Sequence, residues 1–123
     1  MAISVVSLAD SGKYVAVLNN RGCLDTTADF DLKVWAKPLA KVGYDPNYSP
    51  CLRGNKFTFT DLSTVGNSTI LSRNWSTSNP AKVGTGTSFI QTYTSPGNQT
   101  VRLIVTSAEG CLDTEIEIGR AHV

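Results

Sequence analysis

The sequence holds few of the residue types on which enzymes and metal centres depend. Its 123 residues include one histidine, His122, and three cysteines, and only 17% of them are charged. Zinc sites use closely spaced pairs of Cys or His, and Cys23, Cys51 and Cys111 form no such pair. A single histidine at the penultimate position is also a poor candidate for a general base. We therefore expect no catalytic residue, no metal site and no cofactor.

Long apolar runs and clustered charges are missing as well. No stretch approaches the roughly 20 apolar residues that a membrane-spanning helix needs, so membrane insertion is not expected. The 11 Lys and Arg residues nearly balance the 10 Asp and Glu residues, and they are scattered singly along the chain. Nucleic acid binding uses a basic patch or stripe, so nucleic acid is not an expected partner.

Carboxylates are the remaining candidates for acid–base chemistry, but they lie on or beside strand patterns. Glu115 and Glu117, for example, flank Ile116. Since every second residue of a strand points to the same side, such a pair is typical of a solvated strand face. We expect surface positions for Asp25, Asp29, Asp31, Asp113, Glu115 and Glu117.

The most informative feature that is present is an internal repeat. The pentapeptide Gly-Cys-Leu-Asp-Thr occurs at residues 22–26 and again at 110–114, each time after an alternating apolar pattern. Repeats of this kind indicate a tandem array of small modules. The second copy can close a full domain, whereas only 21 residues precede the first. We expect residues 1–37 to be the terminal strands of a preceding repeat, and residues 38–123 to be a complete module.

Apolar residues alternate with a period of two almost throughout, and no window has the spacing of an amphipathic helix. This pattern predicts an all-β fold with a hairpin turn at residues 19–22 and a loop or irregular edge at 78–87. Pro38 and the stretch with Pro46 and Pro50 predict the linker between the two parts, with a boundary near Lys37. Strands are expected at residues 3–8, 13–20, 26–35, 56–61, 70–77, 89–94, 100–106 and 113–118.

Aromatic and branched residues on one side of these strands form the expected core. Trp75 is its central aromatic residue, because a large ring flanked by polar residues buries on one face only. The most regular strand pattern, at 100–106, contributes every second residue. The other expected members are Tyr14, Phe57, Phe59, Tyr93, Val101, Leu103 and Val105.

The cysteines leave two alternatives open. Cys51 precedes one strand pattern and Cys111 follows another, so adjacent strand ends would allow a disulfide between them. Such a bridge would stabilise the fold by roughly 4 kcal/mol in the chain-entropy model, and it implies an oxidising compartment. Cys23 would then be unpaired or would pair between modules. The alternative is three free thiols in a cytosolic protein.

Two segments resemble a known family. Residues 93–105 read Tyr-x-x-Pro-Gly-x-x-x-Val-x-Leu-x-Val, which resembles the closing hairpin of PKD domains. These are Ig-like β-sandwiches of bacterial and archaeal surface proteins, including Bacteroidota-type multidomain proteins. Residues 51–61 resemble the opening strand, and the resemblance covers residues 51–123. It implies an antiparallel, Ig-like (PKD-like) β-sandwich.

The chain departs from the family at one loop. Where PKD domains usually have Trp-Asp-Phe-Gly-Asp-Gly, residues 75–80 read Trp-Ser-Thr-Ser-Asn-Pro. The tryptophan is kept and the acidic residues are not, so no calcium or carbohydrate role of that loop carries over. Asp10–Tyr14 is similar to the corner that opens strand F of Ig-like domains, which implies that the Tyr14 hydroxyl binds the backbone upstream.

Together these features predict a non-catalytic extracellular module, secreted or on the cell surface. It would act as a structural spacer, an adhesion unit or a protein–protein interaction unit in a tandem array. Its partners would be adjacent repeats or identical chains, with a polysaccharide or a surface protein also considered. Alternatives are a self-assembling subunit that adds its N-terminal strands to another copy, and a carbohydrate-binding module of a secreted hydrolase. Three aromatic residues near the linker could either bind a ligand or pack between modules: Trp35, Tyr44 and Tyr48.

Overall fold

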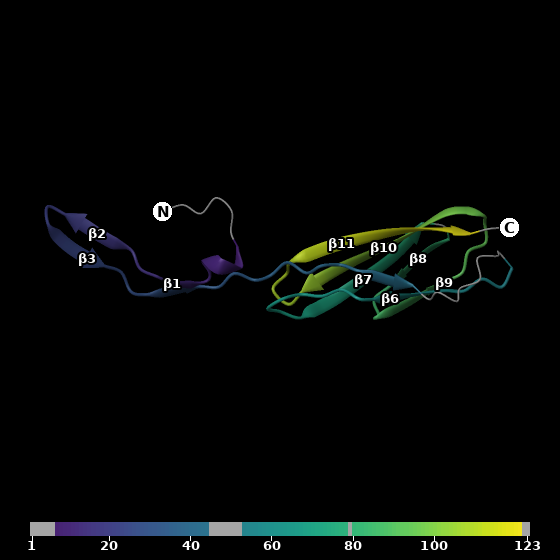
Figure 1. The fold of residues 1–123 in the computed structure, drawn as a ribbon, viewed down its shortest axis with the longest axis horizontal. Helices are drawn as coiled ribbons and strands as arrows, with labels where there is room; N and C mark the ends of the chain where they lie inside the picture. Colours follow the sequence, from purple (N-terminus) through teal and green to yellow (C-terminus); the bar gives the residue numbers. More distant parts are fainter. Residues whose placement is uncertain (1–6, 45–52, 79, 122–123) are drawn as a thin grey trace. The chain divides into compact units, whose positions relative to one another are not determined.

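The computed structural model describes residues 7–44, 53–78 and 80–121, and it divides the chain into two compact units. Unit 1 is Met1–Ala36 and unit 2 is Lys37–Val123, which puts the boundary one residue before the expected one. Nearly all regular structure is β (Figure 1). Among the residues described, no helix has the length and apolar character needed to cross a membrane.

Unit 1 is an interrupted two-stranded hairpin. A short 3-10 helix, Leu8–Asp10, is followed by strands β1 (Gly12–Tyr14), β2 (Val17–Asn20), β3 (Cys23–Thr26) and β4 (Phe30–Leu32). Strand β2 pairs with β3, and β1 pairs with β4. The turn residues Arg21 and Gly22 both have positive φ, at 50° and 83°, which is the two-residue turn that matches strand twist. The structure therefore confirms the expected hairpin turn.

Three expectations for unit 1 need correction. The return strand expected at 26–35 is limited to Thr26, which ends β3, and the separate strand β4 (Phe30–Leu32). The strand expected at 13–20 is divided between Tyr14 and Val17, because Ala16 bonds Thr27 through both its backbone N–H and its carbonyl oxygen at a break in the ladder. Of the strand expected at 3–8, residues 3–6 lie outside the described residues, Ser7 is in no strand, and Leu8 begins the 3-10 helix. The Tyr14 hydroxyl donates a hydrogen bond to the Asp10 carbonyl oxygen at 2.6 Å, as the resemblance to a tyrosine corner implied.

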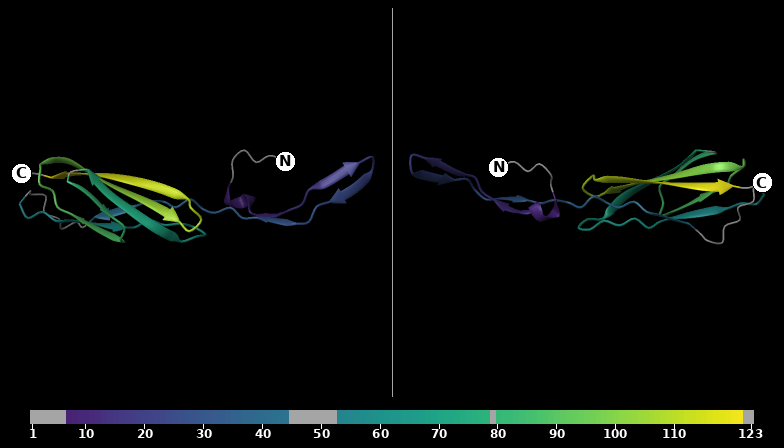
Figure 2. Two further views of the ribbon diagram at one scale, coloured as in Figure 1. Left: turned by 180° about the vertical axis from the view of Figure 1, so that it is seen from behind. Right: turned by 45° about the horizontal axis from the view of Figure 1, so that its top comes forward.

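Unit 2 is an antiparallel β-sandwich (Figures 1 and 2). One sheet has the order β5-β6-β9, and the other has the order β11-β10-β7-β8. Figure 2 shows the yellow strand β11 beside the green strand β10 in both views. The strands are β5 (Val42–Tyr44), β6 (Phe57–Asp61), β7 (Ile70–Ser78), β8 (Ala81–Gly84), β9 (Ser88–Gln91), β10 (Gly97–Ser107) and β11 (Leu112–Ala121).

The first strand of the sandwich, β5, was not expected. It pairs with β6, and its Val42 is buried in the core. The stretch with Pro46 and Pro50 therefore lies between two strands of unit 2, and the prediction that it links the two units is wrong. Pro38 is itself buried. The segment expected as a loop or irregular edge contains the edge strand β8.

The core lies between the two sheets of unit 2. Side chains alternate along β10 between buried and more exposed positions, as the period-two pattern predicted. Tyr14 differs from the expectation, because it is only half-buried and stacks on Phe30 within unit 1, with ring centroids 5.7 Å apart. The buried hydrophobic residues are Ala40, Val42, Phe57, Phe59, Trp75, Phe89, Tyr93, Val101, Leu103 and Val105.

Trp75 organises one end of this core. Its side chain is 1% exposed, and the indole Nε1 donates a hydrogen bond to the Gly86 carbonyl oxygen at 2.8 Å. The ring stacks on Phe89 with a centroid separation of 5.7 Å. Gly84 pairs with Trp75 across β7 and β8, and a Cβ atom there would lie 2.7 Å from the Phe89 ring. The absence of a side chain at Gly84 is therefore needed for the stacked pair.

An ion pair joins the two sheets. Arg73 on β7 donates a hydrogen bond from Nε to the carboxylate of Asp61 on β6, and the Asp61 side chain is 3% exposed. The backbone N–H of Ser63 donates to the other carboxylate oxygen at 2.9 Å. Burial alone would raise the pKa of Asp61, but the hydrogen bonds from Ser63 and Arg73 outweigh it and hold the pKa below its usual value.

Gly84→Ala should destabilise unit 2 by about 1–3 kcal/mol, because the new methyl group displaces a buried ring that cannot move freely. The measurement is the free energy of unfolding in urea, followed by tryptophan fluorescence. Gly119→Ala is the matched control, since Gly119 is also in a strand and a Cβ there meets nothing within 4 Å. Equal stabilities of the two variants would contradict the packing role of Gly84.

Asp61 should make unit 2 sensitive to acid. Its pKa is lower in the folded protein than the ordinary 3.8, so its stabilising effect is present above pH 3.8 and is lost as the pH falls through the folded value. Asp61→Asn should lower the free energy of unfolding by about 1.5–3 kcal/mol at neutral pH and should flatten its decline below about pH 4. Urea titrations at several pH values test this, with Asp29→Asn as the control. If the free energy of unfolding of Asp61→Asn declines in acid as steeply as that of the wild-type protein, the prediction is wrong.

Candidate functional site

Strand β11 has its acidic residues toward the interior and its isoleucines toward solvent. Asp113, Glu115 and Glu117 are all half-buried, whereas Ile116 and Ile118 are 56% and 69% exposed. The expectation that these three carboxylates form a solvated face is therefore wrong. The physical reason is that β11 is an edge strand of the four-stranded sheet. Its inner face therefore lies next to the first segment of unit 2.

The carboxylates of β11 serve as acceptors for backbone N–H groups of that first segment. Asp113 accepts a hydrogen bond from the Ala40 N–H at 2.8 Å, and Glu115 accepts one from the Val42 N–H. Lys37 Nζ also lies 2.8 Å from a carboxylate oxygen of Asp113. The hydrogen bonds from Lys37 and Ala40 hold the pKa of Asp113 below its usual value. Two side chains thus tie the last strand of unit 2 to its first.

This arrangement leaves several apolar side chains exposed on the outer face of the four-stranded sheet. On β10, Arg102 lies opposite Ile116 of β11 on one side and opposite Ser76 of β7 on the other. Ser76 in turn lies opposite Val83 of β8. Directly opposed residues share a face, so this row crosses the whole sheet on the side away from the core. Leu112 belongs to the same face, because its partner Thr106 alternates with the buried Val105.

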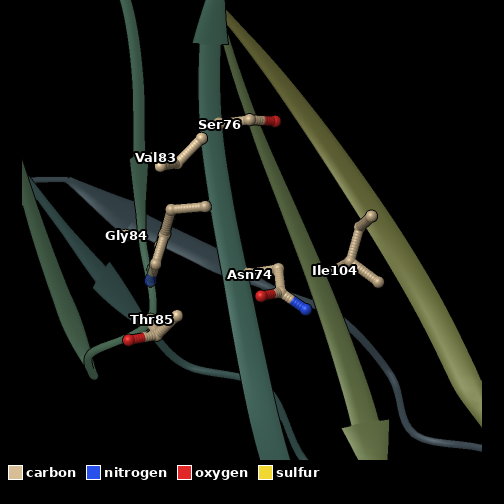
Figure 3. A pocket seen from close by; sticks show the side chains of 7 residues that line it. Asn74, Ser76, Val83, Gly84, Thr85 and Ile104 are labelled. Carbon is tan, nitrogen blue, oxygen red and sulfur yellow. The ribbon is translucent and has the colours of Figure 1, made fainter.

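A hollow of about 560 Å³ lies on this outer face, over β7 and β8 (Figure 3). It combines polar side chains, such as Asn74 and Thr85, with the apolar side chains of Val83 and Ile104. None of its lining residues is acidic, basic or a histidine, so it can contact a ligand but offers no acid–base pair. Its lining residues are Asn74, Trp75, Ser76, Val83, Gly84, Thr85 and Ile104.

The aromatic residues proposed as an interaction surface fall in different parts of the chain. Trp35 belongs to unit 1 and is half-buried, and Lys33 Nζ lies 4.0 Å from its ring centroid. Tyr44 belongs to β5 of unit 2 and is exposed. Tyr48 lies outside the described residues. The interaction surface expected from these three residues therefore stays a prediction.

The cysteines leave the disulfide untested. Cys23 and Cys111 are free thiols in the structure, the first exposed and the second half-buried. Cys51 lies outside the described residues, so the bridge between Cys51 and Cys111 stays a prediction. Cys111 lies at the end of the β10–β11 hairpin, where its N–H bonds the Ser107 hydroxyl at 3.2 Å.

The described residues hold no group of three or more side chains that could bind a metal ion. Asp31 pairs with Lys13 at 3.5 Å on the exposed surface of unit 1, and His122 lies outside the residues described. Sequence reasoning missed the acceptor roles of Asp113 and Glu115 and the hollow around Asn74. These residues carry no sequence signal of their roles, since each is a polar residue in a strand pattern like any solvent-facing strand residue.

Comparisons with known proteins identify the architecture. No protein-family model matches the chain, and no curated protein matches it significantly. Among solved structures, the PKD1 domain of Vibrio anguillarum Epp is similar, with a TM-score of 0.62 and 19% identity, over 73% of this chain and 99% of that domain. The PKD1 domain of the Vibrio cholerae metalloprotease PrtV is also similar, with a TM-score of 0.59 and 21% identity, over 71% and 99%. The chain therefore contains a β-sandwich with the Ig-like fold of PKD domains.

Proposed function

We propose that this chain is a non-catalytic module of an extracellular protein, secreted or at the cell surface, and that it serves as a structural spacer and protein–protein contact within a tandem array. The fold supports this proposal, because a domain of the same architecture occurs in the metalloprotease PrtV. The internal repeat supports the array. Neighbouring modules of similar type would be its partners.

The observation that carries the proposal is the tie between the first and last segments of unit 2. Asp113 and Glu115 on β11 bind the backbone at Ala40 and Val42. A tension applied to both ends of the unit would act on these two segments first. Charge-assisted hydrogen bonds of this kind contribute about 1.5–3 kcal/mol each, so the closure is well placed to resist unravelling.

The use of polar groups elsewhere in unit 2 supports a structural role. Asn55 is buried, and its side-chain amide forms two hydrogen bonds with the backbone of Tyr93, at 2.6 and 2.7 Å. Arg73 and Asp61 join the two sheets. Catalytic groups with shifted pKa values are usually found facing a cleft, whereas these groups bind other parts of the same sandwich.

Single-molecule pulling on both ends of unit 2 within the full chain tests this function. In reducing buffer, which keeps the cysteines unlinked, wild-type unit 2 should unfold in one step, with a contour-length gain of about 30 nm at roughly 3.6 Å per residue. The double variant Asp113→Ala/Glu115→Ala should unfold at a lower force, because the tie between first and last strands is lost. Glu117→Ala, on the same strand and face, is the control and should keep the wild-type force. Equal forces in all three proteins would contradict a load-resisting closure.

A carbohydrate-binding role is a second candidate, which the hollow on the outer face favours. Asn74, Ser76 and Thr85 offer hydrogen-bonding groups beside the apolar side chains of Val83 and Ile104. Titration with soluble polysaccharides, followed by NMR, should then shift signals of the hollow saturably, and Asn74→Ala should weaken the binding. If no polysaccharide shifts these signals, this candidate is removed and the spacer role is unaffected.

A further inference from the structure

The two copies of the repeated pentapeptide occupy the same place in two hairpins. The first glycine of each copy has positive φ, 83° at Gly22 and 87° at Gly110, and each belongs to the turn between two antiparallel strands. The Leu-Asp-Thr segment of each copy lies in the returning strand. The sequence repeat is therefore also a repeat of local structure. The contacts of one hairpin can be used to infer the contacts that the other would form in the same surroundings.

The register of the two hairpins also agrees. Asp25 lies opposite Leu18 in unit 1, and Asp113, at the same position of the repeat, lies opposite Val105 in unit 2. In both hairpins an apolar residue and an aspartate therefore share one face. The leucine before the aspartate points to the other face in both hairpins, and it is exposed at Leu24 as it is at Leu112.

The two hairpins differ in what covers the aspartate face. Val105 is 0% exposed and belongs to the core, whereas Leu18 is 65% exposed. Asp113 accepts the Ala40 N–H and pairs with Lys37, whereas Asp25 accepts the N–H of the next residue, Thr26. An isolated two-stranded hairpin is at best marginally stable in water. The face with Leu18 and Asp25 therefore corresponds in register to the inner face of β10–β11, but it is exposed.

We propose that this face of unit 1 binds the body of another β-sandwich of the same kind, which rests on the proposed function as a module of an array. The body means the strands that correspond to β5–β9. The hairpin would add edge to edge to the strand equivalent to β7, and Leu18 would enter the core beside it. Asp25 would accept a backbone N–H and an ammonium group from the body's first segment, as Asp113 does from Ala40 and Lys37.

A second, intact copy of this chain is not the occupant. In every copy, strand β7 is already paired with β10, and the inner face of β5-β6-β9 already packs on Val101, Leu103 and Val105. The hairpin of another copy would have to displace the covalently attached hairpin β10–β11, together with the seven residue pairs that β10 forms with β7. The partner is therefore a sandwich body whose own closing hairpin is absent.

The test supplies such a body from the chain itself. Residues 37–96, which contain β5–β9, are joined ahead of Met1 of the full chain. Hydrogen–deuterium exchange of the amides in residues 12–32 is then compared between the extended and the original chain. Docking should slow the exchange of these amides by a factor on the order of a hundred in the extended chain.

Two matched variants separate docking from a general effect of the added residues. Leu18→Asp should abolish the slow exchange, because it places a charge on the docking face. Leu24→Asp, at a similarly exposed leucine on the opposite face, should leave the exchange slow. Fast exchange in the extended chain, or equal effects of the two variants, would overturn the proposal. So would a dimer of the original chain with slow exchange at Leu18, which would assign the face to a second copy. The pulling experiment that tests the proposed function loads unit 2 alone, so its outcome does not depend on whether the hairpin of unit 1 docks.

Discussion

Backbone N–H groups at the edge of a sheet need hydrogen-bond acceptors. In this sandwich, the acceptors that meet this need also connect the first segment of unit 2 to its last strand. The N–H groups of Ala40 and Val42 find carboxylates of β11 instead of another strand. This requires Asp113 and Glu115 to lie on the inner side of β11, and alternation then directs Ile116 and Ile118 outward. The exposure of these isoleucines is a consequence of the same constraint.

The interior is fixed by a second set of directional contacts. Trp75 fills the core and satisfies its indole N–H at Gly86, while Gly84 leaves the space that the stacked Phe89 ring needs. Arg73 and Asp61 join the sheets through a buried carboxylate. Each contact combines burial with a satisfied polar group, which is the condition for burying polar atoms without a large cost. The Arg73–Asp61 pair and the stacking of Trp75 on Phe89 both join the two sheets.

The same local sequence has different surroundings in the two units. Gly22 and Gly110 begin equivalent returning strands, yet Leu18 is exposed where Val105 is buried. The positive φ of the glycine and the pairing of the aspartate with an apolar residue are local properties, so a pentapeptide and its preceding strand reproduce them in both places, although the second turn is longer. Burial is not local, because it depends on whether a second sheet faces the hairpin. This difference connects the array proposed for the chain with the docking face proposed for unit 1.

The sequence by itself determined the strand class, the hairpin turn at Arg21 and Gly22, and the burial of Trp75 and of the alternate residues of β10. These depend on period-two patterning and on turn chemistry, which act over a few residues. Only the tertiary structure decided that β5 belongs to the sandwich, that the acids of β11 face inward, and that a hollow forms beside Asn74. Those outcomes depend on which strands lie at the edges of the two sheets and which backbone groups remain there without a strand partner. No local pattern carries that information, because it is set by contacts between segments more than 70 residues apart, such as Ala40 and Asp113.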